Sequence, residues 1–161
     1  MGTLKANTLI EKHGFVDSDK GSPKHDKIQL WIYDNAAKAI DDLFIKGEYE
    51  FRIKERQWEY KILEKTSSYN AAAKQIVGFI DLYVSYLRSC DKIEDVWPCV
   101  YFEIKVEIPS LGDLFRQLNF YKTYLRPSPK LVIVSPDDKY CNLIKEQGFY
   151  FYKYQDKDLL F

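Results

Sequence analysis

The sequence carries no net charge, because its 24 lysine and arginine residues balance its 24 aspartate and glutamate residues. This balance supplies no overall attraction for a polyanion, so any contact with nucleic acid must come from a local basic surface. The sequence also lacks the pattern of a signal peptide and any apolar run near the roughly 20 residues that a membrane helix requires. We therefore expect a soluble, cytoplasmic protein with no membrane partner.

Residues that bind zinc are scarce. The three cysteines, Cys90, Cys99 and Cys141, are odd in number, and their spacings match neither a zinc site nor a disulfide framework. His13 and His25 are the only histidines. We expect the cysteines to be reduced and structural. The sequence offers little of the histidine and thiolate density that a zinc centre uses.

The remaining composition favours a single domain. Of the 161 residues, 46% are hydrophobic and 16% are aromatic, which is enough to bury a core. Residues 1–24 hold a short apolar cluster and then a polar stretch with glycine, serine and proline, and they predict an N-terminal arm. The main domain is expected over residues 25–161, with no internal repeat and no low-complexity tract.

Hydrophobic periodicity predicts a helix, three strands, a helix, a strand, a helix and a final strand. The first helix is expected to follow a cap at Ser22, with Pro23 in its first turn, and to continue to Gly47. The later elements are expected at 48–65, as one long or two short strands, and at 75–88, 99–108, 111–125, 130–135, 140–147 and 149–154. This order predicts an α/β or α+β fold with a central mixed sheet flanked by helices.

Charged residues interrupt two of the expected strands. Glu103 and Lys105 lie two residues apart in the stretch CVYFEIKVEI, so both side chains leave the same face of the strand. Asp81 stands between Ile80 and Leu82 in the preceding strand, where an acid is costly to bury without a compensating cation. If the two strands are neighbours, Asp81 and Glu103 converge. Oxygen ligands of this kind are those that magnesium and manganese prefer.

The helix expected after these strands adds two polar residues. Its apolar stripe leaves Gln117 and Tyr121 one turn apart on the flank, from which both can point their polar tips toward the sheet. An ordinary structural interpretation exists for every one of these residues. Glu103 and Lys105 would form an exposed pair on an edge strand. Asp81 would cap a bulge or end its strand early, and the helix pair would be boundary residues.

Together the three elements resemble the signature of the PD-(D/E)XK nuclease superfamily, in particular its RecB-like branch. That signature reads G-x-x-D, then E-x-K, then Q-x-x-x-Y. In this sequence the matching pairs are Gly78 and Asp81, Glu103 and Lys105, and Gln117 and Tyr121. The resemblance is close over residues 76–124, and the expected order of helices and strands extends it over most of the chain.

The resemblance implies a restriction-endonuclease-like fold and a metal-dependent phosphodiesterase. Asp81 and Glu103 would bind one or two Mg²⁺ or Mn²⁺ ions, with the main-chain carbonyl of Ile104 as a further ligand. Lys105 would position or help to deprotonate the attacking water, or stabilise the pentacovalent phosphorus. The polar pair on the helix would hold the nucleic acid or brace the site.

An upstream metal ligand is expected from one of two residues. Glu59, in the stretch QWEYKI, resembles the carboxylate that precedes the G-x-x-D strand in many members of the superfamily. His25 resembles the histidine that RecB-like nucleases carry at the start of the first helix. We rank Glu59 ahead, because a histidine at the start of a helix is more often a capping or surface residue.

Contacts with DNA are expected around the helix that carries Gln117 and Tyr121. Basic residues near this helix could follow a phosphate backbone. They are Arg116, Lys122, Arg126 and Lys130. The alternative is a solvated surface, which is the usual place of scattered lysine and arginine residues.

The resulting hypothesis is a single-domain, Mg²⁺- or Mn²⁺-dependent deoxyribonuclease that hydrolyses phosphodiester bonds. The small size leaves no room for a separate recognition domain, so pairing of two copies is a further hypothesis. One alternative is a catalytically inert member of the same fold that binds nucleic acid or serves as a scaffold. Another is an unrelated α/β interaction domain whose resemblance is accidental.

Overall fold

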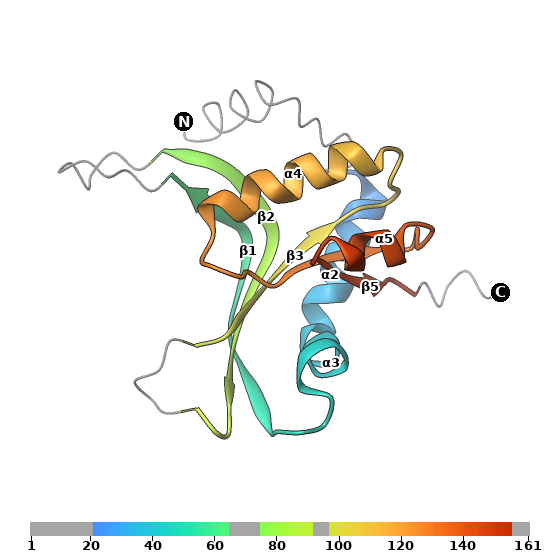
Figure 1. Ribbon diagram of the computed structural model, residues 1–161. Coiled ribbons are helices and arrows are strands. Elements are labelled where there is room, and N and C mark those ends of the chain that lie inside the picture. The colour runs from blue at the N-terminus through green and yellow to red at the C-terminus, as the bar shows by residue number, and fades with distance from the viewer. Residues whose placement is uncertain (1–20, 65–74, 92–96, 156–161) are drawn as a thin grey trace.

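Five strands form one mixed sheet (Figure 1). The computed structural model describes residues 21–64, 75–91 and 97–155. The strands are β1 (Phe51–Leu63), β2 (Ile76–Arg88), β3 (Cys99–Ile104), β4 (Leu131–Ser135) and β5 (Tyr150–Lys153). They lie side by side in the order β1-β2-β3-β4-β5. The first two pairs are antiparallel, and the last two pairs are parallel.

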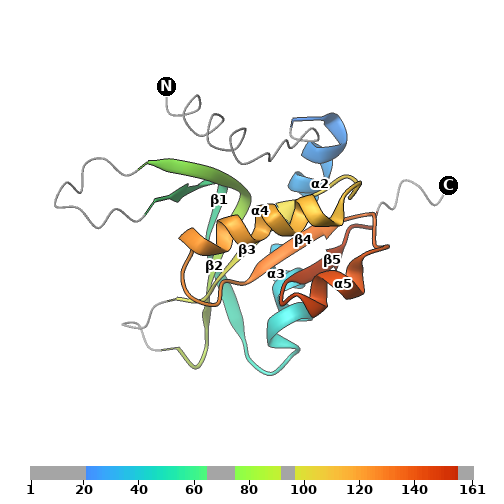
Figure 2. The ribbon, with the colours of Figure 1, turned by 45° about the horizontal axis from the view of Figure 1, so that its top comes forward.

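Helices cover both faces of this sheet (Figure 1 and Figure 2). They are α2 (Pro23–Asp34), α3 (Ala36–Ile40), the π-helical turn η1 (Asp41–Ile45), α4 (Leu111–Tyr124) and α5 (Cys141–Glu146). α2, α3 and η1 pack on one face, and α4 and α5 pack on the other. The predicted element order and the mixed sheet flanked by helices are confirmed. Over the described ranges, no helix combines the length and apolar character needed to cross a bilayer.

The first helix begins where the sequence predicts and then breaks. The side-chain oxygen of Ser22 accepts a hydrogen bond from the N–H of His25 at 3.2 Å, which confirms the cap. The prediction of one helix up to Gly47 is wrong, because the helix is interrupted at Asn35. The side-chain amide of Asn35 donates to the carbonyl of Trp31 at 2.8 Å. The same carbonyl also accepts the backbone N–H of Asn35 at 2.9 Å, so the side chain adds a second donor at the point where α2 ends.

The boundary of the expected N-terminal arm differs from the observed start of α2, and other expectations fall on residues outside the described ranges. α2 begins at Pro23, so residues 23 and 24 belong to the first helix and not to an N-terminal arm. Residues 1–20, which make up most of the expected arm, are not described. Residues 65–74 and 92–96, which fall mostly between expected strands, are also outside the described ranges.

Each face of the sheet has its own hydrophobic core. On one face, apolar residues of α2 and α3 pack with Leu82 of β2 and Phe102 of β3. On the opposite face, Leu118 of α4 and Ile144 of α5 pack with Ile133 of β4. β4 is buried along its whole length, as the sequence predicts for a strand covered on both faces.

β3 ends sooner than the sequence predicts. The strand stops at Ile104 and does not continue to residue 108. Lys105 still donates its N–H to the carbonyl of Val134 at 3.0 Å, but Ile108 donates its N–H to the carboxylate of Asp137, also at 3.0 Å. The prediction is wrong over this segment because a side chain, and not a neighbouring strand, accepts the backbone hydrogen bond.

α4 approaches the backbone of β2 at a glycine. The side chain of Ser110 accepts the N–H of Asp113 at 3.3 Å and so caps α4. A methyl group built at Gly78 would lie 2.7 Å from Cε1 of Tyr121. Glycine at this position therefore lets the Tyr121 ring pack directly on the β2 backbone.

Gly78→Ala is expected to lower the free energy of unfolding by about 1–3 kcal/mol, because the added methyl group overlaps the Tyr121 ring. Gly112→Ala is the matched control, since a methyl group at Gly112 meets no atom within 4 Å and alanine favours a helix. Urea denaturation measures both variants. Wild-type stability in Gly78→Ala would contradict the described packing of α4 on β2.

Candidate active site

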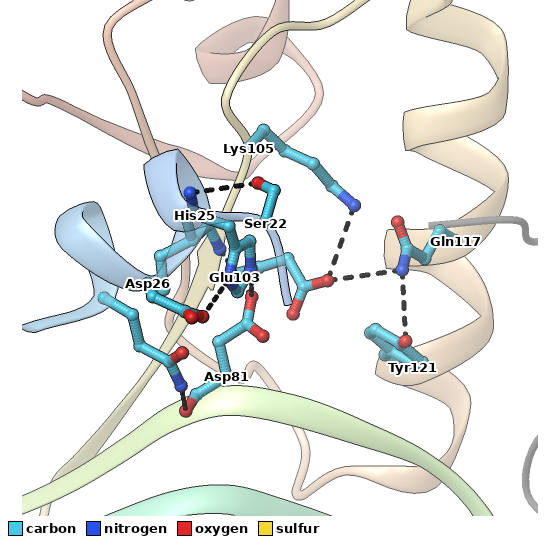
Figure 3. A network of polar contacts seen from close by, with 10 residues as sticks. Ser22, His25, Asp26, Asp81, Glu103, Lys105, Gln117 and Tyr121 are labelled. Carbon is cyan, nitrogen blue, oxygen red and sulfur yellow. Dashed lines mark hydrogen bonds and ion pairs between the residues drawn. The ribbon is translucent and has the colours of Figure 1, made fainter. Parts of the chain in front are cut away.

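Asp81 and Glu103 occupy matching positions on neighbouring strands. The β2–β3 ladder ends with the pair Leu82 and Phe102, and Asp81 and Glu103 are the next residues of their strands beyond this pair. Oδ2 of Asp81 accepts the N–H of Ile104 at 2.8 Å, so a side chain replaces the next hydrogen bond of the ladder. Both acids are 0% exposed. The two carboxylates therefore lie where β2 and β3 part (Figure 3).

The alternation of β2 breaks at Asp81. In a regular strand, Ile80 and Leu82 would point to the same face. Here Ile80 belongs to the core under α4, whereas Leu82 belongs to the core under α2 and α3. Gln29 of α2 donates its side-chain N–H to the main-chain carbonyl of Asp81 at 2.9 Å. This hydrogen bond holds the irregular backbone of β2 against α2.

Glu103 is the centre of a second set of contacts. Its Oε1 lies 3.6 Å from Nζ of Lys105 and accepts a hydrogen bond from Nε2 of Gln117 at 3.2 Å. The same amide nitrogen donates to the hydroxyl of Tyr121 at 3.1 Å. Gln117 and Tyr121 therefore both point from α4 toward the sheet, as the sequence predicts (Figure 3).

Burial decides between the interpretations of Glu103 and Lys105. Their interpretation as an exposed pair on an edge strand is wrong, because β3 lies inside the sheet and the two residues are 0% and 8% exposed. Burying a carboxylate is costly in free energy unless opposite charge and hydrogen bonds compensate. The ammonium group of Lys105 and the amide of Gln117 supply such contacts to Glu103.

Of the two upstream candidates, His25 is the one that the structure shows in contact with Asp81. His25 is 1% exposed, and its Nε2 lies 3.4 Å from Oδ2 of Asp81. Glu59 is exposed on β1, with a positive φ of 50°. Ser22 caps the helix through the backbone N–H of His25, and the imidazole of His25 is turned inward, toward Asp81.

Two supporting residues were missed at the level of sequence. Gln29 holds the carbonyl of Asp81, and Asp137 accepts the N–H of Ile108 in the segment that follows Lys105. One signal for Gln29 is present, because it lies one helical turn after His25 and shares its face. Asp137 lies beyond β4, and nothing in the local pattern connects it with Lys105.

The basic residues do not form one surface. Arg116 pairs with Asp113 on the exposed side of α4, and Lys122 and Arg126 are exposed farther along. Lys130 donates to the hydroxyl of Tyr86 at 2.9 Å, and Tyr86 belongs to the core under α2 and α3. The expected grouping of Lys130 with the other three is therefore wrong, because its ammonium group has a partner on the opposite face of the sheet.

Three tyrosines pack on the α4 side of the sheet. The rings of Tyr60 and Tyr83 stack with centroids 4.6 Å apart, and Tyr101 lies 5.5 Å from Tyr83. Burial raises the pKa of Tyr83 and the pKa of Tyr101. Both phenols therefore stay protonated at neutral pH, and neither serves as a base for activating water.

The donor set fits a hard divalent cation. Mg²⁺ is usually held through one or two carboxylates, together with waters and phosphate oxygens, and the same ligands suit Mn²⁺. Asp81 and Glu103 supply two carboxylates, and the imidazole of His25 lies beside Asp81. Within the part of the chain that the structure describes, no three His, Cys, Asp or Glu side chains are arranged to hold an ion. Water and phosphate would therefore have to supply the remaining ligands.

Comparison with known proteins leaves the site to be judged on its own geometry. No protein-family model, no curated protein and no solved structure matches the chain. The elements G-x-x-D, E-x-K and Q-x-x-x-Y are thus a resemblance carried by six residues, which the fold brings to one place.

Gln117→Glu is expected to lower the free energy of unfolding at neutral pH by roughly 3 kcal/mol or more. The variant keeps the shape of the side chain but puts a carboxylate in place of the amide that donates to buried Glu103. Gln57→Glu is the matched control, because Gln57 is exposed on β1, and it should change stability by about 0.5 kcal/mol or less. Urea denaturation in the presence of chelator measures the free energy of unfolding of both variants. Equal stability of the two variants would contradict the contact between Gln117 and Glu103.

Proposed function

We propose that the protein is a Mg²⁺- or Mn²⁺-dependent nuclease of the PD-(D/E)XK type that hydrolyses phosphodiester bonds in DNA. The observation that carries this proposal is the meeting of Asp81, Glu103 and Lys105 at the point where β2 and β3 part. Burying two carboxylates opposite each other costs desolvation free energy, and such arrangements are typical of functional sites. The sequence resemblance supports the same assignment independently of the geometry.

A divalent ion held by Asp81 and Glu103, with the main-chain carbonyl of Ile104 as a further ligand, would lower the pKa of a bound water and neutralise charge on the scissile phosphate. The protein residues prepare the site for it. Hydrogen bonding to Ile104 N–H orients the Asp81 carboxylate, and the Gln117 amide orients that of Glu103. The imidazole of His25, on α2, lies beside the Asp81 carboxylate.

Lys105 is the residue of this site with an ammonium group beside a candidate metal ligand. Its Nζ lies 3.6 Å from Glu103, and its side chain is 10% exposed. From this position it would orient the attacking water or stabilise the negative charge that develops on the phosphate. Arg116, Lys122 and Arg126, exposed along or just after α4, would contact the DNA backbone.

A catalytically inert member of the same fold is the second candidate. The observation in its favour is burial, because Asp81, Glu103 and Lys105 are at most 8% exposed and leave a phosphate little access. Such a module would bind nucleic acid or act as a scaffold. The nuclease proposal includes a cytoplasmic location. It also includes pairing of two copies, since a small single domain gains a longer DNA-binding surface by pairing.

Purified protein is expected to cleave labelled single-stranded, double-stranded or branched DNA in manganese or magnesium, and not in chelator. Asp81→Asn, Glu103→Gln and Lys105→Ala should each lower the rate by about 10²-fold or more, because each removes a metal ligand or the charge beside it. Gel electrophoresis of the products measures the rate and shows which class of DNA is cut.

Lys145→Ala is the control for Lys105→Ala, because Lys145 is exposed on α5. Its rate should equal that of the wild type. Full activity in Lys105→Ala would remove the catalytic assignment of that lysine. Folded wild type that cuts none of the three DNA classes with either metal would favour the inert module.

A further inference from the structure

A shallow cavity of about 310 Å³, wide open to solvent, lies between α2 and β1, beside the candidate active site. It is lined by Asp26, Gln29, Leu30, Trp58 and Glu59. Its volume is at the lower end of the range of roughly 300–1,000 Å³ that is typical of sites for small ligands. The lining combines two large apolar side chains with three polar ones, of which Gln29 also supports Asp81 through its carbonyl.

The apolar wall of this cavity is held in place and exposed. Trp58 is 38% exposed, and its indole stacks on the ring of Tyr33 with centroids 4.5 Å apart and an interplanar angle of 14°. The guanidinium group of Arg56 lies 5.2 Å from the centre of the Tyr33 ring. Leu30, on α2, is 58% exposed. An aromatic ring fixed by a second ring and presented to solvent is the usual platform for an unpaired base.

The polar wall selects against phosphate. Asp26 and Glu59 contribute carboxylates, and none of the lining residues within the described ranges is a lysine or arginine. An ionised carboxylate accepts hydrogen bonds and donates none. The two carboxylates therefore favour a ligand that presents N–H donors beside an aromatic face. Guanine presents adjacent ring N–H and amino donors on one edge, whereas the ring N–H of thymine stands between two carbonyl acceptors.

The cavity borders the candidate active site at three points. Gln29, which lines it, donates to the carbonyl of Asp81. Glu59 lies opposite Asp81 across the β1–β2 ladder, between the pairs formed by Trp58 and Tyr60, and neighbouring strands are about 4.8 Å apart. His25 lies between Asp26 and Asp81, with Nδ1 3.8 Å from one and Nε2 3.4 Å from the other.

We propose that this cavity binds one unpaired nucleobase, guanine by preference, of a DNA strand whose phosphate lies at Asp81 and Glu103. The base stacks on Trp58, and its N–H donors face the carboxylates of Glu59 and Asp26. The substrate class is then DNA with an unpaired nucleotide beside the cleaved bond. This inference rests on the proposed nuclease function for the position of the phosphate, but base binding itself is measurable without cleavage.

The test compares two labelled single strands, an oligothymidylate and the same strand with one central guanine. Fluorescence anisotropy gives their affinities for the wild type in chelator, and for Lys105→Ala in manganese. The guanine strand should bind more tightly. Trp58→Ala should weaken its binding by roughly tenfold, and Trp58→Phe should restore most of it. Glu59→Gln should reduce the preference for guanine.

Two matched controls come from α5, away from the cavity. Leu143→Ala tests the loss of an exposed apolar side chain, and Glu146→Gln tests the loss of an exposed carboxylate. Both should bind like the wild type. Three results would overturn the base site. They are equal affinity for the two strands, unchanged binding in Trp58→Ala, and no binding of either strand in either buffer.

The outcomes separate this inference from the nuclease proposal. Metal-dependent cleavage with normal binding by Trp58→Ala would overturn the base site and leave the nuclease intact. Guanine-dependent binding that requires Trp58, without cleavage of any DNA, would support the base site and identify the protein as an inert binding module.

Discussion

The hydrogen bond from the N–H of Ile104 to the carboxylate of Asp81 is the contact on which the arrangement of the candidate site depends. In a continuing antiparallel ladder, a main-chain carbonyl would accept hydrogen bonds along the strand. Here a side chain does so, and β2 changes the faces of its residues at the same point. The parting of the two strands brings Asp81 and Glu103 together at the end of their ladder, inside the protein.

Two helices on opposite faces of the sheet support the two acids in the same way. α2 presents His25 and Gln29, one turn apart, to the side chain and the carbonyl of Asp81. α4 presents Gln117 and Tyr121, also one turn apart, on the side of Glu103. Residues four apart on a helix share a face, so each helix supports its acid with a single polar pair. The absence of a side chain at Gly78 lets α4 come close enough to do this.

Local patterns were enough to predict the element order, the cap at Ser22, and the common face of Glu103 and Lys105, because these depend on neighbours along the chain. The pairing of β2 with β3 at matching positions required a register that no local pattern contains. The inward turn of His25 and the part played by Asp137 depend on distant contacts as well. The break at Asn35 was missed because hydrophobic spacing continues through it.

Titration of Mn²⁺ into the metal-free protein, followed by calorimetry, tests most directly whether Asp81 and Glu103 are metal ligands. The account predicts saturable binding by the wild type and by Asp34→Asn, whose aspartate is exposed at the end of α2. It predicts loss of that binding in both Asp81→Asn and Glu103→Gln. Equal binding in all four proteins, or none in the folded wild type, would contradict the account.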